Sequence, residues 1–83
     1  MNFYHRVNER VDVLVDFAGA KVRPLVFKWG GRDYQVKKVN LVHMAREGRD
    51  KIYYFSVTDD ANYFKLKYNT DSMEWVLEET YSN

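Results

Sequence analysis

The chain has 83 residues, no cysteine and only two histidines, which excludes disulfides and the usual structural zinc sites. One hydrophobic core is expected to hold it as a single domain over residues 1–83, with aromatic residues, 17% of the total, supplying much of the buried area. No stretch has the apolar run of a secretory signal or a membrane span, which indicates a cytoplasmic protein without a membrane partner.

Net charge is only +1, which favours no class of partner, but the charges are unevenly distributed. Residues 21–67 carry eleven lysines and arginines against five acids, whereas residues 68–83 carry four acids and no base. Such asymmetry is typical of a binding surface. It is equally typical of charge pairing between neighbouring strands.

Apolar residues at every second position predict the first two strands. Residues 11–17 alternate valine and phenylalanine with aspartate and leucine, and residues 18–20 break this pattern with a glycine. Residues 25–29 alternate again, after Pro24, which suits an edge, a bulge or the start of a strand.

The pair Gly30-Gly31 predicts a two-residue hairpin, because both central positions of a type I′ turn need a positive φ. The position of this turn predicts which residues of the two flanking strands lie opposite each other. The expected opposing pairs place apolar residues on one face and opposite charges on the other: Trp29 with Arg32, Lys28 with Asp33, Phe27 with Tyr34, and Leu25 with Val36.

The third predicted strand changes parity, with apolar residues at even positions up to Val36 and at odd positions from Val39. An extra residue at Lys37-Lys38 would restore both sets to one face, so we expect a β-bulge there. These two lysines are also candidates for contact with an anionic ligand; a solvated bulge is the simpler interpretation.

Two further hairpins follow. Residues 51–57 and 64–68 form strands joined by a tight turn at Asp59-Asp60, and residues 69–72 form the next turn. A two-residue turn at Asp59-Asp60 would place the following residues opposite each other: Phe55 and Phe64, Tyr53 and Leu66, and Tyr54 and Lys65. The last turn would similarly pair Leu66 with Trp75, Phe64 with Leu77, and Lys67 with Glu74.

These elements predict an all-β fold of about six antiparallel strands in a meander. A single sheet without helices must bury its apolar face within the chain, and curling into a small, partly open barrel achieves this. Dimerisation through the sheet face or an edge is the alternative.

Catalysis has little support. His43 continues the alternation of its strand and is expected to end that strand at the barrel rim, while Asp12 and Asp16 are expected to be solvated acids. Gly30-Gly31 lacks the lysine and helix of a phosphate-binding loop, and no serine lies in a nucleophile motif. We therefore expect no enzyme, no cofactor and no metal.

A binding surface is the better candidate. The outward face of the fourth and fifth predicted strands carries Ile52, Tyr54, Ser56, Tyr63, Lys65 and Lys67. Aromatic rings interleaved with lysines on a sheet are typical of single-stranded nucleic-acid binding, with rings stacking on bases and ammonium groups following phosphates.

The candidate nucleic-acid-binding residues are therefore Tyr54, Tyr63, Lys65, Lys37 and Lys38. An ordinary exposed sheet face explains the same residues. In that interpretation Glu74 neutralises Lys67, and Lys65 forms a cation–π pair with Tyr54.

The segment Trp-Gly-Gly-Arg-Asp-Tyr-Gln-Val, residues 29–36, with Val39 after it, resembles the W-x-G-R-x-Y-x-V signature of a small bacterial β domain family of unknown function. Residues 63–68, then Trp75 and Leu77, resemble the closing hairpin of that family. Resembling domains are attached to translesion-type DNA polymerases, which implies single-stranded nucleic acid or a DNA-repair protein as partner. The family often has another tryptophan near the position of His43, which this chain lacks.

The leading functional hypothesis is a non-catalytic accessory module with weak nucleic-acid binding. The alternative is a protein-interaction module or homodimer that uses an exposed edge or the face carrying Tyr54 and Tyr63.

Overall fold

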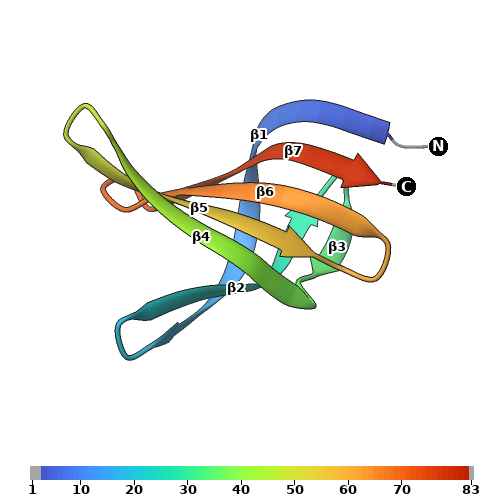
Figure 1. Ribbon diagram of the computed structural model, residues 1–83, viewed down its shortest axis with the longest axis horizontal. Coiled ribbons are helices and arrows are strands. Elements are labelled where there is room, and N and C mark those ends of the chain that lie inside the picture. The colour runs from blue at the N-terminus through green and yellow to red at the C-terminus, as the bar shows by residue number, and fades with distance from the viewer. Residues whose placement is uncertain (1–2, 83) are drawn as a thin grey trace.

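The computed structural model describes residues 3–82, which form seven β-strands (Figure 1). Over this range no helix is long and apolar enough to span a membrane. The strands are β1 (Phe3–Ala18), β2 (Lys21–Trp29), β3 (Arg32–Gln35), β4 (Lys38–Glu47), β5 (Asp50–Thr58), β6 (Asn62–Asn69) and β7 (Glu74–Ser82).

All seven strands belong to one antiparallel sheet with the order β3-β2-β1-β7-β6-β5-β4. The first strand pairs with the last, as in an up-and-down barrel, but β3 and β4 do not pair although they are consecutive in the chain. The sheet therefore curls without closing, and the prediction of an all-β antiparallel fold is confirmed. There are seven strands because the third predicted strand is divided at residues 36–37 into β3 and β4.

Two bends produce the curl. The 16-residue β1 pairs with β7 up to Val11 and with β2 from Asp12 onward, so it belongs to both halves of the sheet. An irregularity between Arg6 and Glu9, where Asn8 has a φ of 51°, bends the first of these halves. The second bend is the division between β3, which pairs with β2, and β4, which pairs with β5.

The predicted hairpin at Gly30-Gly31 is confirmed. Both glycines have positive φ, at 60° and 77°, as the turn requires. The register is as predicted, including the charge pair Lys28–Asp33 and the aromatic pair Phe27–Tyr34. Beyond β3, the backbone N–H of Val36 donates to the carbonyl of Leu25 at 2.8 Å, which extends the predicted pairing by one more step.

The predicted bulge at Lys37-Lys38 is instead a change of strand partner. After Val36 bonds to β2, the backbone N–H of Lys37 donates to the carbonyl of Thr58 on β5 at 2.9 Å. The irregularity in register lies slightly later, between Val39 and Leu41. The change in the position of the apolar residues is therefore present in the structure. It occurs mainly at the corner where the chain passes from one half of the sheet to the other.

Both later hairpins differ from the predicted register, the first by two residues throughout and the last by two as far as Leu66 and by three beyond the irregularity at Lys65/Leu66, where Phe64 lies opposite Thr80. Phe55 lies opposite Leu66, and Leu66 lies opposite Leu77, so the faces are retained although the partners change. The turn after β5 is longer than two residues because Asp59 Oδ1 accepts the backbone N–H groups of Ala61 and Asn62, at 2.8 and 2.6 Å.

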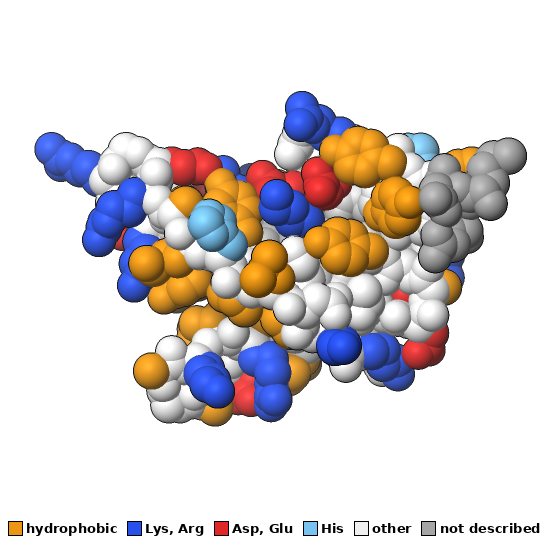
Figure 2. Space-filling view, in the orientation of Figure 1, with side chains coloured by type: hydrophobic (Ala, Val, Ile, Leu, Met, Phe, Trp, Pro, Cys, Tyr) orange, Lys and Arg blue, Asp and Glu red, His pale blue; other side chains and the backbone are white. Residues whose placement is uncertain are grey.

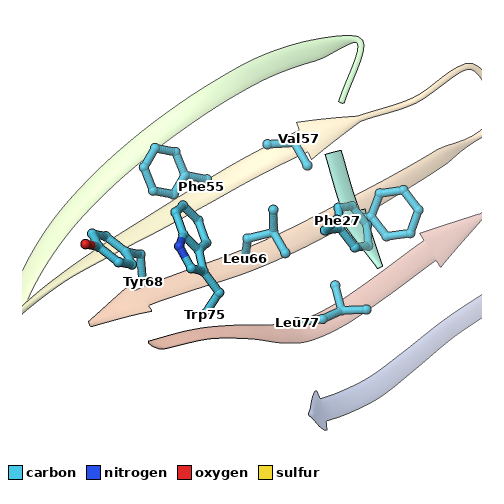
Figure 3. Packing of buried hydrophobic residues seen from close by; sticks show 8 residues of the cluster. Phe27, Phe55, Val57, Leu66, Tyr68, Trp75 and Leu77 are labelled. Carbon is cyan, nitrogen blue, oxygen red and sulfur yellow. The ribbon is translucent and has the colours of Figure 1, made fainter. Parts of the chain in front are cut away.

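The core lies on the concave side of the curled sheet (Figure 3). Its buried residues are Phe27, Phe55, Val57, Phe64, Leu66, Tyr68, Trp75 and Leu77. Trp75 is buried, as predicted, but its ring packs against Tyr68 at 4.6 Å between centroids and Phe55 at 5.4 Å. Ile52, predicted to be exposed, is fully buried outside this cluster, opposite Ala45 and Asn69.

Candidate functional site

The convex face of the sheet carries most of the residues predicted to bind nucleic acid. Strand alternation directs Tyr54, Tyr63 and Lys65 to this face, opposite to the buried Phe55 and Phe64. Figure 2 shows that lysine, arginine, acidic and hydrophobic side chains are mixed over this side of β4–β7.

The structure brings Tyr54 and Lys65 together and places the other candidates apart from them. Lys65 Nζ lies 5.4 Å from the centroid of the Tyr54 ring, a cation–π contact. Tyr63 and Lys38 both lie opposite Thr58, towards the other end of β5. Lys37 lies at the corner before β4, with Nζ 3.5 Å from the side-chain oxygen of Gln35.

Tyr54 is already engaged by its own chain. Its hydroxyl donates to Glu47 at the end of β4, and Lys67 donates to the other oxygen of that carboxylate at 2.9 Å. The predicted Lys67–Glu74 pair is therefore wrong, because Lys67 lies opposite Val76 and Glu74 pairs with Arg10. The hydrogen bond to Glu47 raises the pKa of Tyr54 to about 12.

We expect replacement of Glu47 by glutamine to return the Tyr54 pKa towards its ordinary value of 10.0. Because the folded-state pKa is raised, the associated stability is complete below pH 10 and is lost as pH rises to about 12. NMR titration of 13C-labelled tyrosine rings, assigned with Tyr54→Phe, measures this value directly. An unchanged midpoint in Glu47→Gln would contradict the Tyr54–Glu47 bond.

Acidic groups lie beside Lys65. A hollow of about 420 Å³ adjoins it and contains Glu78 and Glu79 as well as Arg6. Glu79 lies directly opposite Lys65 and accepts a hydrogen bond from the Tyr4 hydroxyl at 2.9 Å. This mixture of charges weakens the attraction of the Tyr54–Lys65 region for phosphate.

A row of three tyrosines crosses the same face and was missed by sequence reasoning. Tyr4 lies opposite Tyr81, and Tyr81 lies opposite Tyr63, on the neighbouring strands β1, β7 and β6. Thr58 and Lys38 continue the row across β5 and β4. The row depends on the pairing of β1 with β7, which no local pattern in residues 3–10 indicated.

A groove at the open side of the sheet is the other surface of interest; we call it the seam groove. It has a volume of about 520 Å³ and lies between the β1–β2 hairpin and the concave face of β4 and β5. Figure 2 shows hydrophobic side chains between these two projecting parts. The residues that line it are Asp16, Ala18, Ala20, Lys21, Val22, Arg23, Val39, Val42, Tyr53 and Phe55.

Apolar side chains dominate the seam groove, and part of this surface is open to solvent. Val42 in the lining is 50% exposed, and Met44, two residues further along the same side of β4, is 52% exposed. The acid in the lining, Asp16, accepts a hydrogen bond from Arg23 at 3.0 Å. Exposed apolar surface of this kind is characteristic of a binding site.

A second hollow, of about 610 Å³, lies on the other side of the β1–β2 hairpin. Its lining mixes apolar residues, including Trp75 and the exposed Met73, with two residues of each charge. Arg10 and Glu74, which form an ion pair with each other, are among them. It is therefore a less distinctive surface than the seam groove.

The residues considered for chemistry are dispersed. His43 lies within β4, not at a strand end, and its ring is 6.1 Å from that of Tyr54. Asp16 is bonded to Arg23, whereas Asp12 is exposed and lies opposite Lys28. Over residues 3–82, no group of three or more histidines, cysteines or acids is placed to hold a metal ion.

No protein-family model matches this chain, and neither does any curated protein or solved structure.

Proposed function

We propose that this chain is a non-catalytic protein-interaction module that holds a segment of a partner protein in the seam groove. The observation that carries this proposal is the open side of the sheet, where Val39, Val42 and Phe55 line a groove that residues 3–82 leave unfilled. Burial of apolar surface contributes about 25 cal/mol per Å², so an apolar segment seated there gains affinity from the hydrophobic effect.

The experiment compares two adjacent residues of β4 that face opposite ways. Val42 lines the seam groove, whereas Leu41, 61% exposed, lies on the convex face opposite Ser56. Short peptides are selected on the immobilised domain from a displayed random library, and the affinities of the selected peptides are then measured by fluorescence anisotropy. Both variants are first checked for a parent-like circular dichroism spectrum and thermal midpoint.

We expect Val42→Asp to weaken the selected peptides by about tenfold or more, because it places an unpaired charge in an apolar groove. Leu41→Asp should bind them as the parent does. Equal binding by all three proteins, or a selection that yields no binding peptide, would overturn the proposal.

A second candidate function, binding of single-stranded nucleic acid, is favoured by the tyrosine row. Tyr4 and Tyr81 are exposed, and Tyr63 beside them is half-buried in a row that ends at Lys38. Aromatic stacking contributes about 1–3 kcal/mol per base, so a row of rings followed by a lysine offers a short binding track.

Anisotropy of labelled oligonucleotides at low and moderate salt tests this second function. Double replacement of Lys37 and Lys38 by alanine should weaken binding and reduce its salt dependence by about two phosphate contacts. Lys65→Ala, a change beside Glu79, serves as the comparison and should have a smaller effect. Absence of binding by the parent at low salt would eliminate the nucleic-acid function and leave the protein-interaction proposal intact.

A further inference from the structure

We infer that the partner segment in the seam groove is apolar over most of its length and carries its negative charge at one end only. This acidic end lies beside cations at the tips of the β1–β2 and β4–β5 hairpins. The inference rests on the proposed function and specifies the partner for the same groove. It follows from the order of side chains along the groove, which changes from apolar to cationic towards the tips.

The wall that β4 and β5 form is apolar near the corner at residues 36–37 and cationic at its tip. The residues of this wall that face the concave side form four cross-strand pairs. In order from the corner to the tip they are Val39, Val42, Met44 and Arg46 on β4, opposite Val57, Phe55, Tyr53 and Lys51 on β5. Only the last pair is charged, so the wall has one cationic end.

The cations of this last pair lie next to the groove. Tyr53 lines the groove, and Lys51 Nζ lies 5.4 Å from the centroid of the Tyr53 ring. Arg46 lies directly opposite Lys51, on the same side of β4 as Val42. The other wall also supplies a cation, because Lys21, the first residue of β2, lines the groove. Figure 2 shows lysine and arginine side chains on both of the projecting parts that flank it.

These three cations have no ion-pair partner within residues 3–82. The ion pair in the lining joins Arg23 to Asp16, and the other two ion pairs involve none of the three. Like charges directly opposite each other, as Arg46 and Lys51 are, destabilise a sheet. A carboxylate beside them would offset this repulsion, so charge complementarity favours an acidic group at this end of the groove.

The acids in the neighbouring turns are bonded to each other. Asp71, in the β6–β7 turn, shares a hydrogen bond with Asp50, which raises the pKa of Asp71, while the charge of Arg46 lowers it to a smaller extent. Asp50 lies on the convex side, opposite Glu47, and accepts a hydrogen bond from Asn69 at 2.9 Å. Neither acid forms an ion pair with the cations of the groove within the described residues.

A peptide segment suits this groove better than an acyl chain of the same polarity. Val42 in the lining is 50% exposed, so an occupant of the groove keeps one side in water. A peptide meets that water with its backbone N–H and C=O groups, whereas a fatty acid would leave part of its apolar chain exposed. The carboxylate is therefore assigned to the end of a protein segment.

The same cations disfavour a second copy of this chain as the occupant. Two copies joined groove to groove would bring Lys21, Arg46 and Lys51 of one molecule towards the same residues of the other. A β1–β2 hairpin inserted from a second copy would carry Lys21 into the groove together with the Arg23–Asp16 pair, and so would add positive charge. A partner with an acidic end is the better complement.

The test repeats the library selection on three proteins: the parent, a groove variant with Arg46→Gln and Lys51→Gln, and a control with Lys28→Gln and Arg32→Gln. The control removes the same charge from the β2–β3 hairpin, at the other end of β2. Peptides selected on the parent and on the control should carry aspartate or glutamate at one end of an apolar stretch. Peptides selected on the groove variant should lack this preference.

The tightest peptide from the parent selection is then synthesised with its acidic residues intact or replaced by glutamine. In fluorescence anisotropy at low salt, the replacement should weaken binding to the parent by about threefold or more, and by less at higher salt. The groove variant should show a smaller difference between the two peptides. Each peptide is also made with a free and an amidated C-terminus, which distinguishes acidic side chains from a terminal carboxylate.

Selected peptides that Val42→Asp weakens but that show no acidic preference, or that carry acids at both ends or throughout, would overturn this inference and leave the protein-interaction function intact. A selection without any binding peptide would overturn both. Tighter binding of dodecanoate than of the peptide would identify an acyl chain as the occupant. A concentration-dependent dimer in sedimentation equilibrium that Val42→Asp abolishes would identify a second copy, and either result would contradict the inference.

Discussion

Replacing Trp75 with alanine should lower the free energy of unfolding by about 3–5 kcal/mol, the usual cost of removing a buried tryptophan. The side chain is only 7% exposed, and its ring stacks on Tyr68 and contacts Phe55, so the change leaves a cavity between β5, β6 and β7. A domain of this size has a stability of about 4–12 kcal/mol, so the variant loses a large part of it.

Urea denaturation followed by far-ultraviolet circular dichroism measures the effect of Trp75→Ala. If that variant does not fold, Trp75→Phe provides the measurement, because it retains a ring against Tyr68 and should lose less stability than the alanine variant. A urea midpoint for Trp75→Ala equal to that of the parent, with an unchanged m-value, would show that Trp75 is not a core residue.

Phe27→Ala should be about as destabilising, again by roughly 3–5 kcal/mol, for a different structural reason. Phe27 lies on β2, and its ring meets that of Phe64 on β6 at 4.9 Å, nearly perpendicular, as well as stacking on Tyr34 at 5.3 Å. β2 and β6 are not neighbours in the sheet, so this contact crosses the interior and holds the two halves of the curl together.

The matched control for Phe27→Ala is Phe17→Ala, a phenylalanine on β1 that is 61% exposed. Its removal should change the free energy of unfolding by no more than about 0.5 kcal/mol. Similar losses from the two variants would mean that the concave face is not the core of the fold.

Local features of the sequence predicted local structure well. The hairpin at Gly30-Gly31 was predicted to the residue because two adjacent glycines with positive φ leave one register available. The register predicted for the next hairpin differs from the observed one by two residues, because the length of its turn depends on hydrogen bonds from side chains to the backbone. Asp59 accepts the backbone N–H of Ala61, which lengthens the turn, and composition alone does not distinguish this from a two-residue turn.

The register predicted for the last hairpin differs from the observed one for a similar reason. Asn69 Oδ1 accepts the N–H groups of Asp71 and Ser72, and Met73 adopts a φ of 61°, so the turn extends beyond the predicted residues. The error also changed the assigned partner of Lys67. Its carboxylate partner, Glu47, is 20 residues away in sequence and is brought near by the pairing of β5 with both β4 and β6.

The seam groove could not be predicted from the sequence because it depends on a pairing that fails to form. Val39 was recognisable as a strand residue, but the odd-numbered apolar residues from Val39 onward were predicted on one face, whereas the irregularity between Val39 and Leu41 places Leu41 on the convex face and Val42 in the groove. The groove itself follows from two long-range facts, the pairing of β1 with β7 and the separation of β4 from β2. Neither has a local signal in the residues concerned.

Methyl NMR spectra of the domain, with and without a library-selected peptide, test most directly whether the seam groove is the binding site. Saturating peptide should shift the methyl signals of Val39 and Val42, which line the groove, and should leave those of Leu41 on the convex face unchanged. Shifts confined to Leu41, with Val39 and Val42 unchanged in the presence of bound peptide, would contradict the proposed site.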